Sequence, residues 1–415
     1  MTNGLLAEMQ SSMKDYKQGI ILFLTGMIAF SSLCSYITVK LFHLPCVIEV
    51  FLLILIYYYR KDIHFTTNQV VGIFAFVFFG TIIGLLNPKF ELTDILPIAR
   101  CFLLGAIGFV YARNNNIFRN IDALYVFCFG VFIGDIINGF LLIKANIIMG
   151  DDKQYAVDIN IILSVLWAVM TILYKKWYYL FLMCILVPIL CFVSISRGVA
   201  TFFLIGISLA FLTKIIHQPS KIILISAMAV ISFMALTTLY TENEEAVRNF
   251  SPSMHFRLYT KMKNYGGNSA DGNRLFPYKW AVDNMSYYAF PRGFLGKKFL
   301  VPLDGDNTPL MSPWDSAYME IIYTAGLPVF LFLIFFFLRK LVICLKMYQY
   351  TKETIFSMTF IMLALLFFEY IFTYGLIRSP FTVFCNGAFL GFVIRLTAQP
   401  EIFYGNLIPC DNVEN

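Results

Sequence analysis

Two charged residues stand at the edges of apolar runs, where their side chains could act on a substrate at a membrane surface. Arg197 lies in the short turn Ser194-Ile195-Ser196-Arg197-Gly198, between two apolar stretches. A guanidinium is planar and can bind two phosphate oxygens at once, so Arg197 is a candidate phosphate ligand. The alternative is an arginine at a helix end that extends only its charged head to water.

The second is Asp315, in Trp314-Asp315-Ser316-Ala317-Tyr318-Met319-Glu320, where a long polar stretch gives way to an apolar run. A carboxylate at this junction could act as a general base at the membrane surface. It could equally cap the helix that follows, which is an ordinary structural role. The sequence leaves both interpretations open.

Other charged residues lie inside or beside apolar runs, where a charge is costly and is usually functional. They are Glu49, Arg100, Asp135, Glu320, Glu369 and Arg378. Within the polar stretch, Arg274 in Gly272-Asn273-Arg274-Leu275 opens an expected amphipathic helix that leads to Trp280. The remaining arginines there, Arg248, Arg257 and Arg292, are balanced by acidic residues and suit a solvated surface.

The elements that must position these residues are membrane helices. The chain has 415 residues, of which 59% are hydrophobic and only 13% are charged, about half the charged share of soluble domains. This predicts an all-α integral membrane protein and excludes an ordinary soluble enzyme. The positive residues sort by topology, so the net charge of +6 does not indicate a nucleic-acid partner.

A span needs about 20 apolar residues, which predicts about twelve transmembrane helices. Their approximate ranges are 19–39, 41–59, 65–86, 94–112, 121–143, 156–174, 177–195, 198–213, 221–239, 317–338, 354–374 and 379–396. Four parts follow: transmembrane helices over 1–240, a large outward loop over 241–313, further transmembrane helices over 314–396, and a tail over 397–415. The start of the chain lacks a small-residue cleavage pattern, so its first apolar run is expected to be a retained span.

Lysines and arginines concentrate in alternate connections between the spans, which predicts the orientation. The rich set contains Lys14, Lys17, Arg60, Lys61, Arg113, Arg119, Lys175, Lys176, Lys214, Lys221, Arg339, Lys340, Lys346 and Lys352. The opposite set is sparse and contains Lys40, Lys89, Lys144, Lys153, Arg197 and Arg378. Both termini are therefore expected in the cytoplasm, and the 241–313 loop is expected outside.

No metal or nucleotide site is predicted. The nine cysteines have no metal-ligand spacing, the four histidines are scattered, and no phosphate-binding GxxxxGK[ST] motif is present. We therefore expect no metal and no cofactor.

Three segments together resemble the O-antigen polymerase and O-antigen ligase superfamily of bacterial polysaccharide assembly. The first is Ser196-Arg197-Gly198 in an outward turn. The second is the long loop with Asn273-Arg274, Trp280 and 291–296. The third is Asp315-Ser316-Ala317-Tyr318, followed by Glu320 and Thr324-Ala325-Gly326-Leu327. Ligases of this superfamily commonly have a histidine where Asp315 stands, and this departure favours a polymerase.

The resemblance implies a GT-C-like, metal-independent, inverting glycosyltransferase in the bacterial cytoplasmic (inner) membrane. Its donor would be a glycan on undecaprenyl pyrophosphate, and its acceptor another lipid-linked repeat unit. A chain-length regulator protein would be a partner. Arg197 and Arg274 would bind the pyrophosphate, and Asp315 would be the candidate base. Substrate-binding residues would be Arg100, Arg257, Arg378, Trp280 and Tyr318, with the aromatic rings stacking on sugars.

Two alternatives remain at this stage. An O-antigen ligase would perform the same chemistry on a different acceptor, lipid A core. A lipid-linked oligosaccharide flippase would bind and move the substrate without breaking a bond. Flippases usually show two similar halves and short outer loops, and neither feature is visible in this sequence.

Overall fold

The computed structural model describes twelve segments of the chain, and all of them are helical or connect helices. They are residues 18–35, 66–86, 92–114, 121–149, 161–194, 197–215, 244–250, 282–283, 285–291, 293, 317–372 and 380–400. No strand occurs within these segments. Three helices are long and apolar enough to cross a membrane: Thr67–Leu85, Ile121–Leu141 and Leu327–Thr351. The prediction of an all-α membrane protein is therefore confirmed at this level.

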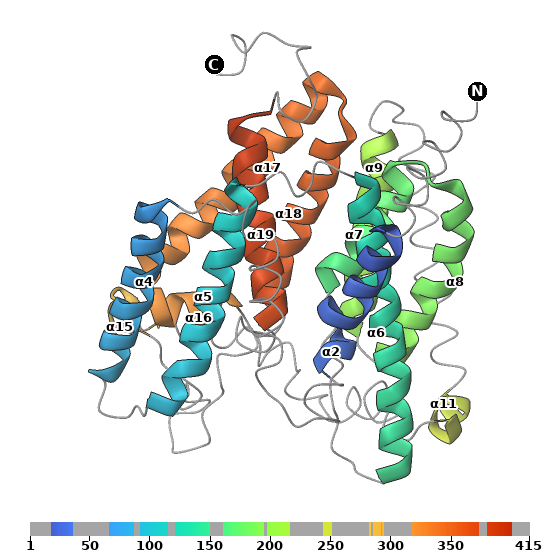
Figure 1. The fold of residues 1–415 in the computed structure, drawn as a ribbon, viewed down its shortest axis with the longest axis horizontal. Coiled ribbons are helices and arrows are strands. Elements are labelled where there is room, and N and C mark those ends of the chain that lie inside the picture. The colour runs from blue at the N-terminus through green and yellow to red at the C-terminus, as the bar shows by residue number, and fades with distance from the viewer. Residues whose placement is uncertain are drawn as a thin grey trace, which may run out of the picture. The chain divides into compact units, whose positions relative to one another are not determined.

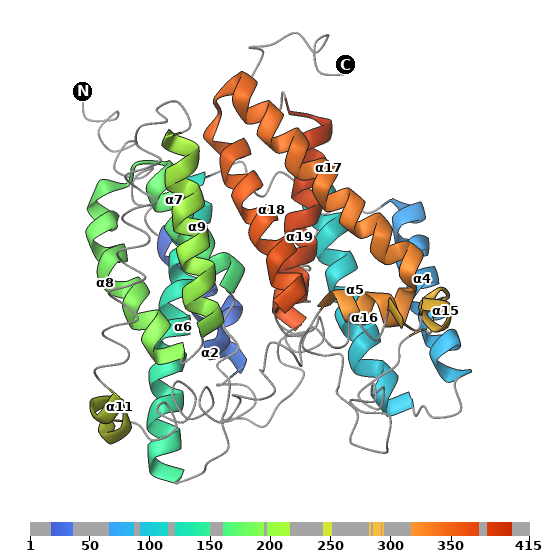
Figure 2. The ribbon, with the colours of Figure 1, turned by 180° about the vertical axis from the view of Figure 1, so that it is seen from behind.

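The helices form two compact units, each of which we describe by itself (Figures 1 and 2). Unit 1 contains η1 (Gly26–Phe30), α2 (Ser32–Ser35), α6 (Ile121–Met149), α7 (Ile161–Leu173), α8 (Trp177–Ser194), α9 (Arg197–Ile215) and α11 (Glu244–Phe250). Unit 2 contains α4 (Thr67–Leu85), α5 (Leu92–Asn114), α15 (Met285–Tyr288), α16 (Ala317–Ala325), α17 (Leu327–Thr351), α18 (Thr354–Phe372) and α19 (Pro380–Ala398). Each unit thus draws on helices far apart in the sequence.

An aromatic core holds unit 1 together around Trp167 of α7, which is fully buried. Its ring centroid lies 4.6 Å from that of Phe132 and 5.1 Å from that of Phe129, both on α6. Phe132 in turn lies 6.0 Å from Phe203 of α9. Such close aromatic pairs stabilise a core beyond the area that they bury, so α6, α7 and α9 form the centre of this unit.

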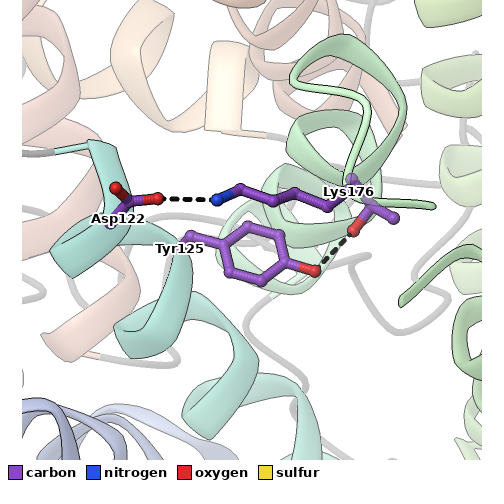
Figure 3. Close-up of polar contacts among 4 residues, drawn as sticks. Asp122, Tyr125 and Lys176 are labelled. Carbon is purple, nitrogen blue, oxygen red and sulfur yellow. Dashed lines mark hydrogen bonds and ion pairs between the residues drawn. The ribbon is translucent and has the colours of Figure 1, made fainter. Parts of the chain in front are cut away.

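Polar contacts join α6 to the end of α7 at one end of unit 1 (Figure 3). The Nζ atom of Lys176 lies 2.8 Å from a carboxylate oxygen of Asp122. The hydroxyl oxygens of Tyr125 and Thr171 are 3.0 Å apart and buried. Lys214 at the end of α9 donates to the carbonyl of Ile172. Lys176 and Lys214, both assigned to the lysine-rich side by the sequence, therefore lie at the same end of the unit.

Close backbone contact joins α5 and α19 in unit 2, although the two helices lie far apart in the sequence.

 α5 ends at Asn114 and α19 begins at Pro380, and the two helices run parallel, side by side in both views (Figures 1 and 2). A Cβ atom added at Gly387 would overlap the carbonyl oxygen of Gly105. Further along, Arg395 donates from Nη1 to the carbonyl of Arg113 at 3.1 Å. Small residues permit this approach, as is common between membrane helices.

Replacing Gly387 with alanine should therefore destabilise the protein by about 1–3 kcal/mol, because the added methyl group overpacks a backbone contact. The matched control is Gly72→Ala in α4, where an added Cβ meets nothing within 4 Å. That substitution should be neutral or slightly stabilising, because alanine favours a helix over glycine. Thermal unfolding of both variants in detergent tests this. Equal unfolding temperatures would contradict the packing argument.

The expected span 317–338 is wrong in its bounds, because Gly326 divides it. Gly326 has φ of 84°, a conformation that glycine adopts without strain, and it separates α16 from α17. In both views α16 runs across the direction of α17 (Figures 1 and 2). α17 then continues past Arg339 to Thr351, and Lys340 donates from Nζ to Thr397 of α19 at 2.6 Å. The Thr397 hydroxyl thus gives a polar partner to Lys340, which lies within α17 although the expected span ended at residue 338.

The first expected span, 19–39, is also interrupted. Its helix passes into the π-helical turn η1, Ser31 is extended with φ of −91° and ψ of 169°, and α2 starts at Ser32. The expected spans 41–59 and 221–239 lie outside the described residues, as does most of the 241–313 loop. The four-part division by sequence therefore stays a prediction.

Candidate functional site

Unit 2 gathers buried polar side chains from four helices, and we call this set the Arg100 cluster. It consists of Arg100 and Cys101 on α5, Tyr318 and Glu320 on α16, Glu369 and Tyr370 on α18, and Asn386 on α19. Polar and charged side chains are expensive inside a membrane protein and are usually kept for a function. Among the described residues of unit 2, the Arg100 cluster is therefore our candidate functional site.

Arg100 and Glu320 provide the opposite charges of the cluster. Both charges act electrostatically on the buried Cys101 thiol, so Arg100 and Glu320 lie in the same region of unit 2. Glu320 is only 6% exposed, whereas Arg100 is half-buried. A carboxylate near an arginine restricts the direction of the guanidinium and compensates its charge.

Tyr318 fixes α16 in the core of unit 2. Its side chain is 1% exposed, and its ring lies 5.5–5.8 Å from the rings of Phe330, Phe367 and Tyr370. The predicted role of Tyr318 in stacking on a sugar stays a prediction. In this packing a sugar would reach the ring only after its aromatic neighbours had moved. The packed ring can, however, help to position Glu320, which lies two residues further along α16.

Glu369, Tyr370 and Asn386 form the second polar part of the cluster, and all three are buried. The side chains of Asn386 and Tyr370 are hydrogen-bonded, and the Glu369 carboxylate acts electrostatically on the same tyrosine. Since the Tyr370 ring also contacts Tyr318, with ring centroids 5.6 Å apart, the α18–α19 part is continuous with α16. The polar side chains of α16, α18 and α19 therefore belong to one packed region.

A piece of the long polar stretch packs on the same helices. Gly293, with φ of 77°, donates from its backbone nitrogen to the carbonyl of Thr324 at 3.0 Å. Its backbone also lies directly against Gly80 and Gly84 of α4, where no side chain would fit. On the neighbouring side, Gly326 meets the backbone of Phe290 and Pro291. Two of the segments singled out in the sequence, 291–296 and 324–327, are therefore in contact.

These residues lie at one end of unit 2. Arg100 and Asn386 lie in the first halves of the parallel helices α5 and α19, and Glu369 is near the end of α18. Arg113 and Arg395 meet at the opposite end. The charge pattern of the sequence assigns the Arg113 end to the cytoplasm, so the cluster lies toward the side predicted to face outward.

The remaining predicted site residues are not brought together by the described part of the chain. Arg197 is the first residue of α9 in unit 1, and its side chain lies outside the description. Arg257, Arg274, Trp280, Asp315 and Arg378 also lie outside the described residues. Of the eight predicted positions, only Arg100 and Tyr318 are therefore located with their side chains.

Several members of the cluster were not predicted as site residues. The sequence had marked Glu369 only as a charge in an apolar run, and Glu320 as such a charge and as part of the third resembling segment. It gave no role to Tyr370 or Asn386. The available signal was a polar amide within the apolar run of α19, which is rare enough to notice. The described residues contain no group of three or more His, Cys, Asp or Glu side chains that could hold a metal ion.

Comparison with known proteins adds no family assignment. The chain matches no family model, and no curated protein shows significant similarity to it.

Proposed function

We propose that this protein is a polymerase of O-antigen or a related surface polysaccharide. It would transfer the growing glycan from undecaprenyl pyrophosphate to a lipid-linked repeat unit at the outer face of the cytoplasmic membrane. The observation that carries the proposal is the Arg100 cluster: a half-buried arginine and a buried glutamate that both act on the same buried cysteine, among apolar helices. The contact between α16 and Gly293 supports it, because it joins the polar stretch to this cluster.

The proposed reaction needs a cation at the leaving group and a base at the acceptor. The bond between the anomeric carbon of the donor glycan and its pyrophosphate oxygen breaks, and the electron pair leaves with undecaprenyl pyrophosphate. The acceptor hydroxyl oxygen attacks the same carbon from the opposite face, and its proton passes to a carboxylate. Arginines stabilise the negative charge that develops on the pyrophosphate. Arg197, Arg274 and Arg100 are assigned to that task, and Asp315 to the base.

The finer architecture belongs to the same proposal. We assign the protein about twelve spans in a GT-C-like arrangement, a position in the bacterial inner membrane, and two cytoplasmic termini. Two observations support the orientation: Lys176 and Lys214 lie at one end of unit 1, and Arg113 and Arg395 are in contact at one end of unit 2. A chain-length regulator is the proposed protein partner. Apolar helix faces would bind the polyprenyl tail.

Deletion of the gene in its host should leave surface lipopolysaccharide with a single repeat unit in place of a ladder of longer chains. Polymerisation would stop, whereas transfer of one unit to its final acceptor would continue. Gel analysis of the polysaccharide measures this, and the control is a strain that carries the intact gene on a plasmid. Loss of all repeat units, including the single one, would contradict the proposal and favour a ligase or a flippase.

A further inference from the structure

A second buried polar set lies in unit 1, and the proposed polymerase reaction does not use it. The carboxylate of Asp135 on α6 is fully buried. Its Oδ1 accepts from the backbone nitrogen and the hydroxyl of Ser32, each at 2.8 Å. Its Oδ2 accepts from the hydroxyl of Ser164 on α7 at 2.8 Å. Asn138, one helical turn further along α6, donates from Nδ2 to the Ser32 hydroxyl at 2.9 Å.

The chain is interrupted where this set forms. The helix that begins at residue 18 ends in the π-helical turn η1, and Ser32 is the first residue of α2. Ser31 lies against Gly134, the residue before Asp135, where a side chain would not fit. Interrupted helices inside membrane proteins commonly form ion sites, because backbone carbonyl oxygens at the interruption are not used in helical hydrogen bonds and can bind an ion.

An oxygen atom of Asn138 points to a ligand beyond the hydrogen bonds already described. Asn138 is 3% exposed, and its Oδ1 has no hydrogen-bond partner in the described part of the chain. A buried amide oxygen without a partner is costly and calls for an explanation, such as a bound ion. Because the Nδ2 of the same amide contacts Ser32, the side chain is directed into this set.

The oxygen types indicate which ligand would fit. The set offers two carboxylate oxygens, two hydroxyl oxygens and one amide oxygen, and these are ligands for a hard cation. A hydroxyl both donates and accepts, so Ser32 and Ser164 can turn lone pairs toward a cation beside the carboxylate. A single carboxylate balances one positive charge. Calcium usually takes more carboxylates, and zinc prefers histidine or cysteine.

We infer that Asp135, Asn138, Ser32 and Ser164 form a binding site for one sodium ion inside unit 1. The bound ion would join the interrupted segment η1–α2 to α6 and α7. The inference is independent of the proposed polymerase function, since none of the four residues belongs to the Arg100 cluster or to the predicted site residues.

Binding of radioactive ²²Na⁺ to the purified full-length protein in detergent tests the inference. We expect saturable binding that unlabelled sodium displaces at a concentration at least tenfold lower than potassium does. Asp135→Asn should abolish it, and Asn138→Ala and Ser164→Ala should weaken it at least tenfold. The matched control is Ser357→Ala on α18, a buried serine of unit 2, which should bind sodium like the unchanged protein.

The outcomes separate the possibilities. Absence of saturable binding to the unchanged protein would overturn the inference, as would equal displacement by potassium. Binding that survives in a folded Asp135→Asn variant would place the ion elsewhere and would also overturn it. If Asp135→Asn does not fold, Asn138→Ala and Ser164→Ala decide, because both keep the carboxylate. Unchanged affinity in these two variants would leave the set a purely structural contact and refute the site.

Discussion

Replacing Arg100 with alanine is expected to lower the rate of polymerisation by about 100- to 1,000-fold, the usual loss when one group that stabilises developing charge is removed. Arg100 is half-buried, and it shares its region of unit 2 with the buried side chains of Glu320 and Cys101. Charge interactions are stronger in such a setting than in water. Arg100→Lys should recover only part of the rate, because an ammonium keeps the charge but loses the planar fork.

The rate is measured with the purified protein and lipid-linked repeat units, as the loss of single units and the growth of longer chains. The matched control is Arg113→Ala, at the other end of the same helix, where the side chain is exposed. That variant should polymerise normally. Normal rates in Arg100→Ala would remove Arg100 from the proposed site, whereas failure of the unchanged protein to polymerise would refute the function itself.

The hydropathy of the sequence predicted many of the helices, because a helix stays in a membrane when its side chains are apolar over about 20 residues. The expected spans 177–195 and 354–374 correspond closely to α8, Trp177–Ser194, and α18, Thr354–Phe372. Each is a long apolar run with polar residues at its ends. Burial of the backbone in such a run requires intrahelical hydrogen bonds, so the run and the helix nearly coincide.

The same measure could not find the two interruptions. An average over about 20 residues is insensitive to one glycine, and Gly326 ends α16 because its backbone also meets Phe290 and Pro291 from the distant polar stretch. The interruption at Ser31 likewise depends on Asp135, since that carboxylate accepts from the first backbone nitrogen of α2. Both breaks are long-range contacts that no local pattern contains.

The site was predicted only in part, for a related reason. Sequence reasoning ranks charges in apolar runs, and this ranking found Arg100, Glu320 and Glu369. It does not say which helices are neighbours. The parallel contact of α5 with α19 brings Arg100 near the level of Asn386, and it depends on glycines such as Gly105 and Gly387 meeting across the interface. Without that contact, Asn386 is one polar residue among many.

Two roles are proposed for Asp315, which lies outside the described residues. A carboxylate just before α16, Ala317–Ala325, can cap that helix or act as a general base at the membrane surface. Replacement by asparagine separates the two roles, because asparagine can cap a helix but cannot serve as the base.

Asp315→Asn should lower the rate of polymerisation by about 100- to 10,000-fold, the usual contribution of a general base. Asparagine retains the ability to cap a helix, so the variant should unfold at the same temperature as the unchanged protein. The decisive measurement is the rate as a function of pH. The unchanged protein should lose activity as the pH falls through the range where the base becomes protonated, and the residual activity of Asp315→Asn should lack that decline.

Glu320→Gln and Glu353→Gln complete this test. Glu353 precedes α18, whereas Glu369 of the cluster lies near the end of that helix, so the Glu353→Gln variant should be fully active. Glu320→Gln should lower the rate, because the glutamine no longer balances the charge of Arg100, but it should keep the decline at low pH. If Glu320→Gln instead loses that decline while Asp315→Asn keeps it, the buried glutamate is the base. The proton would then leave the acceptor hydroxyl for α16 itself, and Arg100 and the base would act as one adjacent pair.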